Sequence, residues 1–190
     1  MEEFLRALLP RLLGDSVSFN VHPYQCKDDL LNKLPARLKG YKNWIPKTWR
    51  IVVVVDRDDD DCHGLKQKIE QMFIAAGLQS RTVTMVATWQ IVSRIAIDEL
   101  ESWYFGDWEA VRTAYSRVPA NLSVQAKYRD PDAIKGTWEA FERVLKKAGY
   151  FKGGLRKIEV ARVLGGNMDP ARNQSRSFQV FRDAILEAIS

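Results

Sequence analysis

The fold is decided by the stretch Trp49-Arg50-Ile51-Val52-Val53-Val54-Val55-Asp56-Arg57-Asp58-Asp59-Asp60-Asp61. Five consecutive β-branched residues without polar alternation predict a strand buried on both faces, as in a mostly parallel sheet covered by helices. The acids begin where the strand ends, and ligands bind beyond the carboxyl ends of strands in such sheets. Asp56 and Asp58 point the same way on an extended segment, and adjacent carboxylates repel unless a cation lies between them. The stretch therefore predicts an α/β fold with a Mg²⁺ or Mn²⁺ site at Asp56 and Asp58.

The acidic run has two other interpretations. A solvated acidic turn that simply ends the strand needs no metal. A calcium loop of the EF-hand type takes Asp56, Asp58 and Asp60 as its first three ligands. Its sixth position is Asp61 instead of glycine and its twelfth is Gln67 instead of glutamate, so this loop fits poorly.

Three further sites compete with the magnesium site. The motif Asp56-Arg57-Asp58 resembles the nucleophile motif of haloacid dehalogenase phosphatases, which place it on their first strand and usually have Thr or Val where this chain has Asp60. Sugar-nucleotide transferases use Asp-x-Asp with Mn²⁺ but generally need a longer chain. A zinc site is the third alternative, although its adjacent Cys-His pair lacks the usual ligand spacing. Its ligands would be His22, Cys26, Cys62 and His63.

Length and composition predict a cytoplasmic globular protein. The chain has 190 residues, of which 46% are hydrophobic and 28% charged, enough for one well-packed domain. Its two cysteines indicate a reducing compartment without a disulfide framework. The N-terminus opens with Glu2 and Glu3, and the longest purely aliphatic run has five residues, so we expect neither a signal peptide nor a membrane span.

Charge is distributed unevenly along the chain. Residues 1–109 carry 14 basic and 16 acidic side chains, a net charge of −2, and residues 110–190 carry 15 and 8, a net charge of +7. An acidic metal site joined to a basic half suits an enzyme that acts on a polyanion, because basic side chains hold phosphates. Many proteins with a high pI never touch nucleic acid, so charge alone leaves the question open.

Hydrophobic periodicity predicts helices alternating with strands up to residue 107, and helices alone after it. This pattern indicates parallel β-α-β units in an α/β core over residues 1–107, with a basic helical extension over 108–190 packed on it as one compact unit. Expected strands besides the central one are Val17–Val21, Thr82–Ala87 and the buried segment 91–97. Expected helices are Glu3–Leu13 (closed by Gly14), Lys27–Leu38 (interrupted by Pro35 and closed by Gly40), Leu65–Ala76, Trp108–Tyr115, Thr137–Ala148 and a last helix with Ser175 or Ser177 as its N-cap and Leu186 on its buried face.

Acids also follow the buried segment 91–97. Asp98 is a suitable N-cap, which would place Glu99 and Glu101 in the first turn of a helix. The helix dipole alone stabilises acids there. The functional interpretation is that Glu99 or Glu101 completes the metal shell of Asp56 or serves as general base; they lie about 200° apart on a helix, so only one is expected to do so.

Two basic segments are candidates for phosphate binding. The loop Gly149–Lys157 surrounds a glycine pair with the basic residues Lys152, Arg156 and Lys157, and its Tyr150 or Phe151 could stack on a base. Arg176, near the N-terminus of the last helix, adds a second expected contact. The alternative is an ordinary inter-helix turn with solvated lysines.

Several motifs resemble a known family. The predicted order of elements resembles the Toprim fold of topoisomerases, primases and related nucleases: strand, helix, strand ending in Asp-x-Asp, helix and strand. Five further motifs are Val21-His22-Pro23-Tyr24-Gln25, Lys27-Asp28-Asp29-Leu30, Val55-Asp56-Arg57-Asp58, Arg94 to Trp103, and Gly153-Gly154-Leu155-Arg156-Lys157. By these motifs the chain resembles the bacterial domain of unknown function 4276 (DUF4276) family over nearly its whole length.

The resemblance implies both a function and a departure from it. Toprim-like proteins of this kind are suspected nucleases in phage defence, often encoded beside an ATPase. Toprim domains open with a strand that ends in a glutamate, and we expect that strand to be missing here, with Glu2 or Glu3 nearest to its place. A second copy of the chain, forming a homodimer, would cover the edge that this leaves.

The leading hypothesis is a metal-dependent phosphodiester hydrolase that acts on DNA or RNA. The second is a non-catalytic module of the same scaffold that binds nucleic acid or an ATPase.

Overall fold

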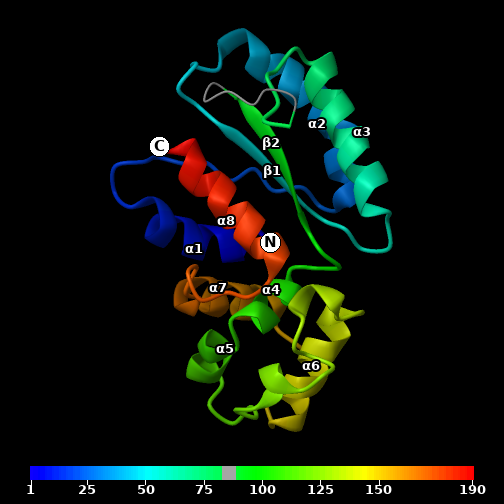
Figure 1. Ribbon diagram of the computed structural model, residues 1–190, viewed down its shortest axis with the longest axis vertical. Helices are drawn as coiled ribbons and strands as arrows, with labels where there is room; N and C mark the ends of the chain where they lie inside the picture. Colours follow the sequence, from blue (N-terminus) through cyan, green and yellow to red (C-terminus); the bar gives the residue numbers. More distant parts are fainter. Residues whose placement is uncertain (83–88) are drawn as a thin grey trace. The chain divides into compact units, whose positions relative to one another are not determined.

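The structure is a computed structural model that describes residues 1–82 and 89–190. Within these residues the chain is α/β with a helical C-terminal half, as predicted (Figure 1). The elements are α1 (Glu2–Leu13), α2 (Lys27–Trp44), β1 (Ile51–Asp56), α3 (Cys62–Ala75), β2 (Ile91–Ala96), α4 (Glu101–Gly106), α5 (Trp108–Ala114), η1 (Leu122–Val124), η2 (Pro131–Ala133), α6 (Thr137–Lys147), α7 (Lys157–Asn167) and α8 (Arg176–Ala188). No helix among them is both long enough and apolar enough to cross a bilayer.

The chain divides into two compact units. One contains Pro23–Ile95, and the other combines Met1–His22 with Ala96–Ser190. The sequence suggested a boundary at residue 107 instead, with the first helix in the same part as the central strand. In the structure α1 belongs with the C-terminal helices.

In the described residues of the unit Pro23–Ile95, two helices lie against a two-stranded parallel sheet. Ile51 N–H donates to the carbonyl of Gln90 at 2.8 Å, where the two strands begin. Ser80 pairs with Ile91 in a parallel bridge beside β2. The leucines of α2 and the apolar side of α3 pack with Val53 and Val55 in one core.

The strand β1 confirms the central prediction with one correction. Val53 and Val55 are buried, whereas Ile51, Val52 and Val54 are only half-buried. The core that α2 and α3 form lies on the side of Val53 and Val55, so these two are buried, and Val52 and Val54 on the opposite face are half-buried where full burial was expected.

Of two other predicted strands, one did not form and the other lies almost wholly outside the described residues. Val17, Phe19 and Val21 are half-buried between exposed neighbours, as the alternation predicts, but the segment is not a strand. A segment with alternating apolar residues forms a strand only when a neighbouring strand hydrogen-bonds to it. Among the residues that the structure describes, no strand pairs with this segment. Of the expected strand Thr82–Ala87, Thr82 lies in a turn and residues 83–87 lie outside the described residues.

The predicted helices mostly hold, and their ends differ. Gly14 ends α1 as predicted. Helix α2 does not end at Leu38 as predicted but continues through Pro35 and Gly40 to Trp44. Leucines on both sides of Pro35 are buried in the core and hold the helix there. In α8, Ser175 is the N-cap and accepts from Phe178 N–H at 3.2 Å, whereas Leu186, expected inside, is 40% exposed. Helix α7 was not assigned a range from the sequence.

Aromatic rings form the core of the other unit. Trp103 stacks on Phe181 with ring centroids 5.0 Å apart, and Phe4 lies 5.8 Å from Trp103. The indole Nε1–H of Trp103 donates to Ser177 Oγ at 2.9 Å, so its one polar atom is satisfied. These contacts join α1, α4 and α8.

Helix α1 also packs closely on α7. A Cβ atom on Gly165 would lie 2.4 Å from the carbonyl oxygen of Phe4 and 3.0 Å from the Cβ of Ala7. Only glycine permits this approach of the two helices.

The two units do not divide the charge as the two halves of the sequence do. The unit Pro23–Ile95 carries 12 basic and 8 acidic side chains, a net charge of +4. The other unit carries 17 and 16, a net charge of +1, because the acids of residues 1–22 and 98–109 belong to it. The excess of positive charge therefore lies mainly in the sheet-containing unit.

Candidate functional site

The acidic segment begins on the last residue of β1. Asp56 is half-buried there, and its Oδ1 atom is buried. The backbone then turns: Asp60 N–H donates to the Arg57 carbonyl at 3.2 Å, and Asp58 adopts a left-handed conformation with φ of 51°. Such conformations are uncommon for a residue other than glycine, and aspartate is one of those that tolerate them.

A lysine lies among these acids. The ammonium Nζ of Lys27, on the first residue of α2, is 2.8 Å from Oδ2 of Asp58 and 2.8 Å from Oδ2 of Asp60. It also donates to the carbonyl of Arg57 at 3.0 Å, so three oxygens receive its three protons. Burial acts to lower the pKa of Lys27, but hydrogen bonds to Asp58 and Asp60 outweigh it and raise the pKa. The acids at the end of β1 are therefore partly neutralised by a cation of the chain itself.

The remaining acids of the run have separate roles. Asp61 caps α3, accepting from Gly64 N–H at 2.6 Å, and Asp59 is exposed. Among residues 1–82 and 89–190, no group of three or more His, Cys, Asp or Glu side chains is arranged to hold a metal ion. The same finding applies to the alternative zinc ligands, and both cysteines are free thiols.

The carboxylates of Asp98 and Glu99, after β2, accept hydrogen bonds from the N-terminus of α6, whereas the sequence predicted that they begin the helix directly after them. Asp98 does not cap the helix that follows it, which begins only at Glu101. Instead its Oδ2 accepts from the N–H of Thr137 at 2.8 Å and from its hydroxyl at 3.0 Å. Glu99 accepts from Trp138 N–H at 2.9 Å, so Asp98 and Glu99 together satisfy the first N–H groups of α6.

Glu99 and Glu101 differ in their environment. Burial raises the pKa of Glu99, although the hydrogen bond from Trp138 N–H and the nearby Lys157 oppose this rise. Glu101 is buried in the first turn of α4. Both belong to the unit that contains Ala96–Ser190, and Asp56 and Asp58 belong to the other unit. Their predicted role at the metal site stays a prediction.

The predicted phosphate-binding residues have distinct local contacts. Arg156 pairs with Glu159 at 3.2 Å, both exposed, and Lys152 is exposed in its loop. Lys157 places its ammonium 3.7 Å from the ring centroid of Trp138. Tyr150, a predicted stacking residue, has the guanidinium of Arg117 4.1 Å above its own ring.

Arg176 is exposed at the start of α8, but the anion position beside it is filled. The carboxylate of Asp132 accepts from Ser177 N–H at 2.8 Å and from the Ser175 hydroxyl at 2.7 Å. A phosphate at this helix N-terminus would have to compete with Asp132.

One buried carboxylate was missed by the sequence interpretation. Glu70 lies in α3 and is 8% exposed. It accepts from Ser93 Oγ at 2.9 Å, from Thr82 Oγ1 at 3.1 Å, and from the hydroxyl of Ser80. These bonds tie α3 to β2 and to the segment after the helix. The signal was a glutamate beside Ile69 on the apolar face of the helix.

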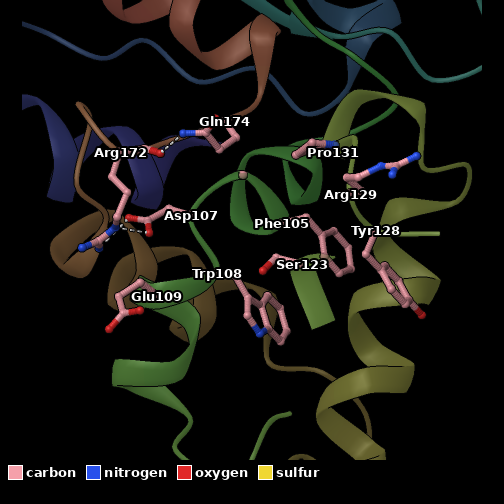
Figure 2. Close-up of a pocket in the computed structure, with 11 residues that line it drawn as sticks. Phe105, Asp107, Trp108, Glu109, Ser123, Tyr128, Arg129, Pro131, Arg172 and Gln174 are labelled. Carbon is pink, nitrogen blue, oxygen red and sulfur yellow. Dashed lines mark hydrogen bonds and ion pairs between the residues drawn. The ribbon is translucent and has the colours of Figure 1, made fainter. Parts of the chain in front are cut away.

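A pocket of about 320 Å³ lies in the unit that contains α4 and α5, and its lining residues include none of the predicted site residues (Figure 2). The ring of Phe105 stacks between Trp108, at 5.9 Å, and Tyr128, at 5.4 Å. Arg172 binds the fully buried carboxylate of Asp107 through two hydrogen bonds of 2.7 and 3.1 Å.

The charges that line this pocket cancel. Arg129 and Arg172 are matched by Asp107 and Glu109, so the lining does not favour a phosphate. Asp107 also accepts from Asp169 N–H at 2.7 Å and caps α5. The pair of Asp107 and Arg172 therefore has a structural role in joining α5 to the segment before α8.

The chain belongs to the family described as domain of unknown function (DUF4276), whose model matches residues 1–186. No curated protein matches the chain, and no solved structure matches it. The family is thus the one predicted from the motifs, and the similarity to Toprim folds stays a prediction.

Proposed function

We propose that this member of the DUF4276 family is a metal-dependent phosphodiester hydrolase that acts on nucleic acid, with Asp56 and Asp58 as ligands of Mg²⁺ or Mn²⁺. One observation carries the proposal: oxygens of Asp58, Asp60 and the Arg57 carbonyl converge on a single cation at the end of a parallel strand. The cation there is the Lys27 ammonium. Hard oxygen donors around one positive charge are what Mg²⁺ prefers.

The donors fit a divalent cation in kind, but Lys27 holds the place between Asp58 and Asp60. A metal and an ammonium repel each other at such distances. The chain therefore has to withdraw Lys27 before Asp58 can offer the same oxygen to a metal. A bound metal would polarise the phosphate and lower the pKa of a water molecule.

The other parts of the proposal rest on the sequence. Glu99 or Glu101 is proposed as general base or third ligand. Lys152, Arg156, Lys157 and Arg176 are proposed to contact phosphates. An ATPase partner and a role in phage defence are proposed from the resemblance. A homodimer is proposed from the sheet edge that the missing first strand would leave, and a cytoplasmic location from the composition.

The test is calorimetric titration of Mg²⁺ and Mn²⁺ into the wild type, Asp58→Asn and Asp59→Asn, with cleavage assays of the same samples on single- and double-stranded DNA and RNA. Asp59 is the matched control, since it is an exposed neighbour in the same run. Asp58→Asn should lose metal binding and cleavage with its circular dichroism unchanged, and Asp59→Asn should keep both. Cleavage retained by Asp58→Asn would overturn the proposal.

A second candidate is a non-catalytic module that binds nucleic acid or an ATPase. The salt bridges of Lys27 favour it, because they neutralise the acids without any metal. This candidate predicts salt-sensitive binding of nucleic acid that persists in EDTA, with no turnover.

A further inference from the structure

The unit Pro23–Ile95 exposes two tryptophans close together. Trp44, the last residue of α2, is 60% exposed, and Trp49, just before β1, is 46% exposed. A turn joins them, closed by Trp49 N–H donating to the Pro46 carbonyl at 3.0 Å. Tryptophan is usually highly buried, so two exposed indoles in one turn call for a ligand or partner.

The rings form a short row. The centroids of Tyr41 and Trp44 are 5.5 Å apart and those of Trp44 and Trp49 are 6.1 Å apart. The interplanar angles are 69° and 75°, so the rings meet edge to face and do not cover one another by stacking. An edge-to-face contact covers at most one face of one ring, and Trp44 and Trp49 stay 60% and 46% exposed, so ring surface is left for a further planar group.

The charge around this row is of one sign. Residues 30–55 contain six basic side chains and no acid, whereas acids flank the stretch at Asp29 and Asp56. Three of the six have local contacts: Lys33 pairs with Asp29, Arg37 lies over Tyr24, and Arg50 lies over Trp89. The other three are Lys39, Lys42 and Lys47, which are exposed and have no ion-pair partner among the residues that the structure describes.

We infer that Tyr41, Trp44 and Trp49, with Lys39, Lys42 and Lys47, form an aromatic–basic surface that binds single-stranded nucleic acid. Bases would stack on the indoles, and the ammonium groups would contact the phosphates between them. A duplex does not offer its base faces to such rings, so the single strand is the form that fits. The inference rests on the nucleic-acid part of the proposed function and moves the main contact away from the predicted loop Gly149–Lys157 to the end of α2 (Figure 1).

Charge and composition favour nucleic acid over a bilayer or an apolar protein partner. The exposed large hydrophobic side chains between residues 39 and 49 are Trp44 and Trp49, and Ile45 is half-buried. A membrane-binding segment would add exposed aliphatic side chains to the tryptophans. An apolar partner would gain nothing from three free ammonium groups.

Fluorescence anisotropy with a labelled 15-nucleotide single strand, as DNA and as RNA, tests the inference in EDTA. We expect Trp44→Ala to weaken binding by roughly 5- to 150-fold and Trp44→Phe to keep most of the affinity. Trp44→Leu separates stacking from mere apolar contact and should behave like alanine. Because Trp44 is exposed, circular dichroism should show the same fold in all three.

The charge contribution is measured by the salt dependence. Replacing Lys39, Lys42 and Lys47 together by glutamine should reduce the slope of log K against log salt by about 2, at about 0.7 per lost phosphate contact. The matched control replaces Lys68, Lys135 and Lys147, which are also exposed. It removes the same charge and should leave the slope nearly unchanged.

Three results would overturn the inference: Trp44→Leu binding as tightly as the wild type, equal slopes for the two triple variants, or tryptophan-dependent binding to vesicles of anionic lipid without binding to the oligonucleotide. If replacing Lys152, Arg156 and Lys157 abolishes binding instead, the proposal that the chain binds nucleic acid stands, but the aromatic–basic surface is refuted as its binding site. Cleavage with Mg²⁺ is scored separately on Asp58→Asn, so failure of the hydrolase proposal remains distinguishable.

Discussion

Replacing Lys27 by methionine removes the cation at the end of β1 while keeping a side chain of similar length. The variant loses two ion pairs of 2.8 Å, to Asp58 and Asp60, and the hydrogen bond of 3.0 Å to the Arg57 carbonyl. Lys27 is 18% exposed, but its partners are 47% and 49% exposed. Solvent therefore screens both pairs, and the two carboxylates are left facing the same space without a cation.

These exposures set the expected loss of stability. Each half-exposed pair contributes about 0.5–1 kcal/mol, well below the several kcal/mol of a fully buried pair. We expect Lys27→Met to lower the free energy of unfolding by about 1–2 kcal/mol, and the Tm by roughly 2–8 °C. Lys33→Met is the matched control on the same helix: its pair with Asp29 is an i,i+4 pair on a 64% exposed side chain. Solvent screens this pair more strongly, so Lys33→Met should lower the free energy of unfolding by less than Lys27→Met does.

The assay is thermal unfolding followed by circular dichroism at pH 7 and low salt, first in EDTA and then with Mg²⁺. If Lys27 and a metal compete for the acids, Mg²⁺ at 100 times the Kd of Lys27→Met should stabilise that variant by about 2.7 kcal/mol and should stabilise the wild type less. Equal losses for Lys27→Met and Lys33→Met in EDTA would refute the role of Lys27 as the neutralising cation. An equal effect of Mg²⁺ on wild type and variant would refute the competition.

Two further predictions concern the other unit. Gly165→Ala should lower the free energy of unfolding by about 1–3 kcal/mol, because the new Cβ clashes with the Phe4 carbonyl. The control Gly166→Ala has open space around its Cβ and should be neutral or stabilising by about 0.5 kcal/mol. Equal chemical denaturation midpoints for the two variants would contradict the close packing of α1 on α7. Burial raises the pKa of Glu99, so the folded state holds this proton more tightly than the unfolded chain does. The free energy of unfolding therefore falls as the pH rises from the pKa of Glu99 in the unfolded chain to its higher pKa in the folded state, and the loss is complete above the latter. Glu99→Gln keeps an acceptor for Trp138 N–H and should be at least as stable as the wild type at pH 7, with an advantage that shrinks as the pH is lowered to 4; a lower Tm at pH 7 would contradict this.

Local patterns predicted most elements of the fold. The valine run, the leucine stripes of α1 and α2, and the apolar face of α6 each depend on neighbours in sequence, and all formed. The failures lie where distant residues decide. Val17, Phe19 and Val21 alternate as a strand does but have no partner strand in the described part of the chain, and Pro35 stays inside a helix because the core holds both sides of it.

The candidate site shows the same division. The sequence located Asp56 and Asp58 at the end of a strand, but it could not show that the ammonium of Lys27, from the start of another helix, would meet Asp58 and Asp60. Asp98 was a suitable helix cap by local rules. It caps α6, whose first residue is Thr137, because the end of β2 and the start of α6 are brought together only by folding.

The unit that begins at Met1 is interrupted in sequence by the whole of Pro23–Ile95, and this has a consequence during synthesis. Chains emerge from the ribosome N-terminus first, so α1 appears before any of the helices that bury Phe4 and Leu8. The inserted segment Pro23–Ile95 is continuous in sequence, so it can complete its own core before the helices that cover α1 have been synthesised. Newly made chains should therefore pass through a stage with one finished unit and one helix whose apolar face is exposed. Chaperones would bind the chains at this stage, and premature release would favour aggregation.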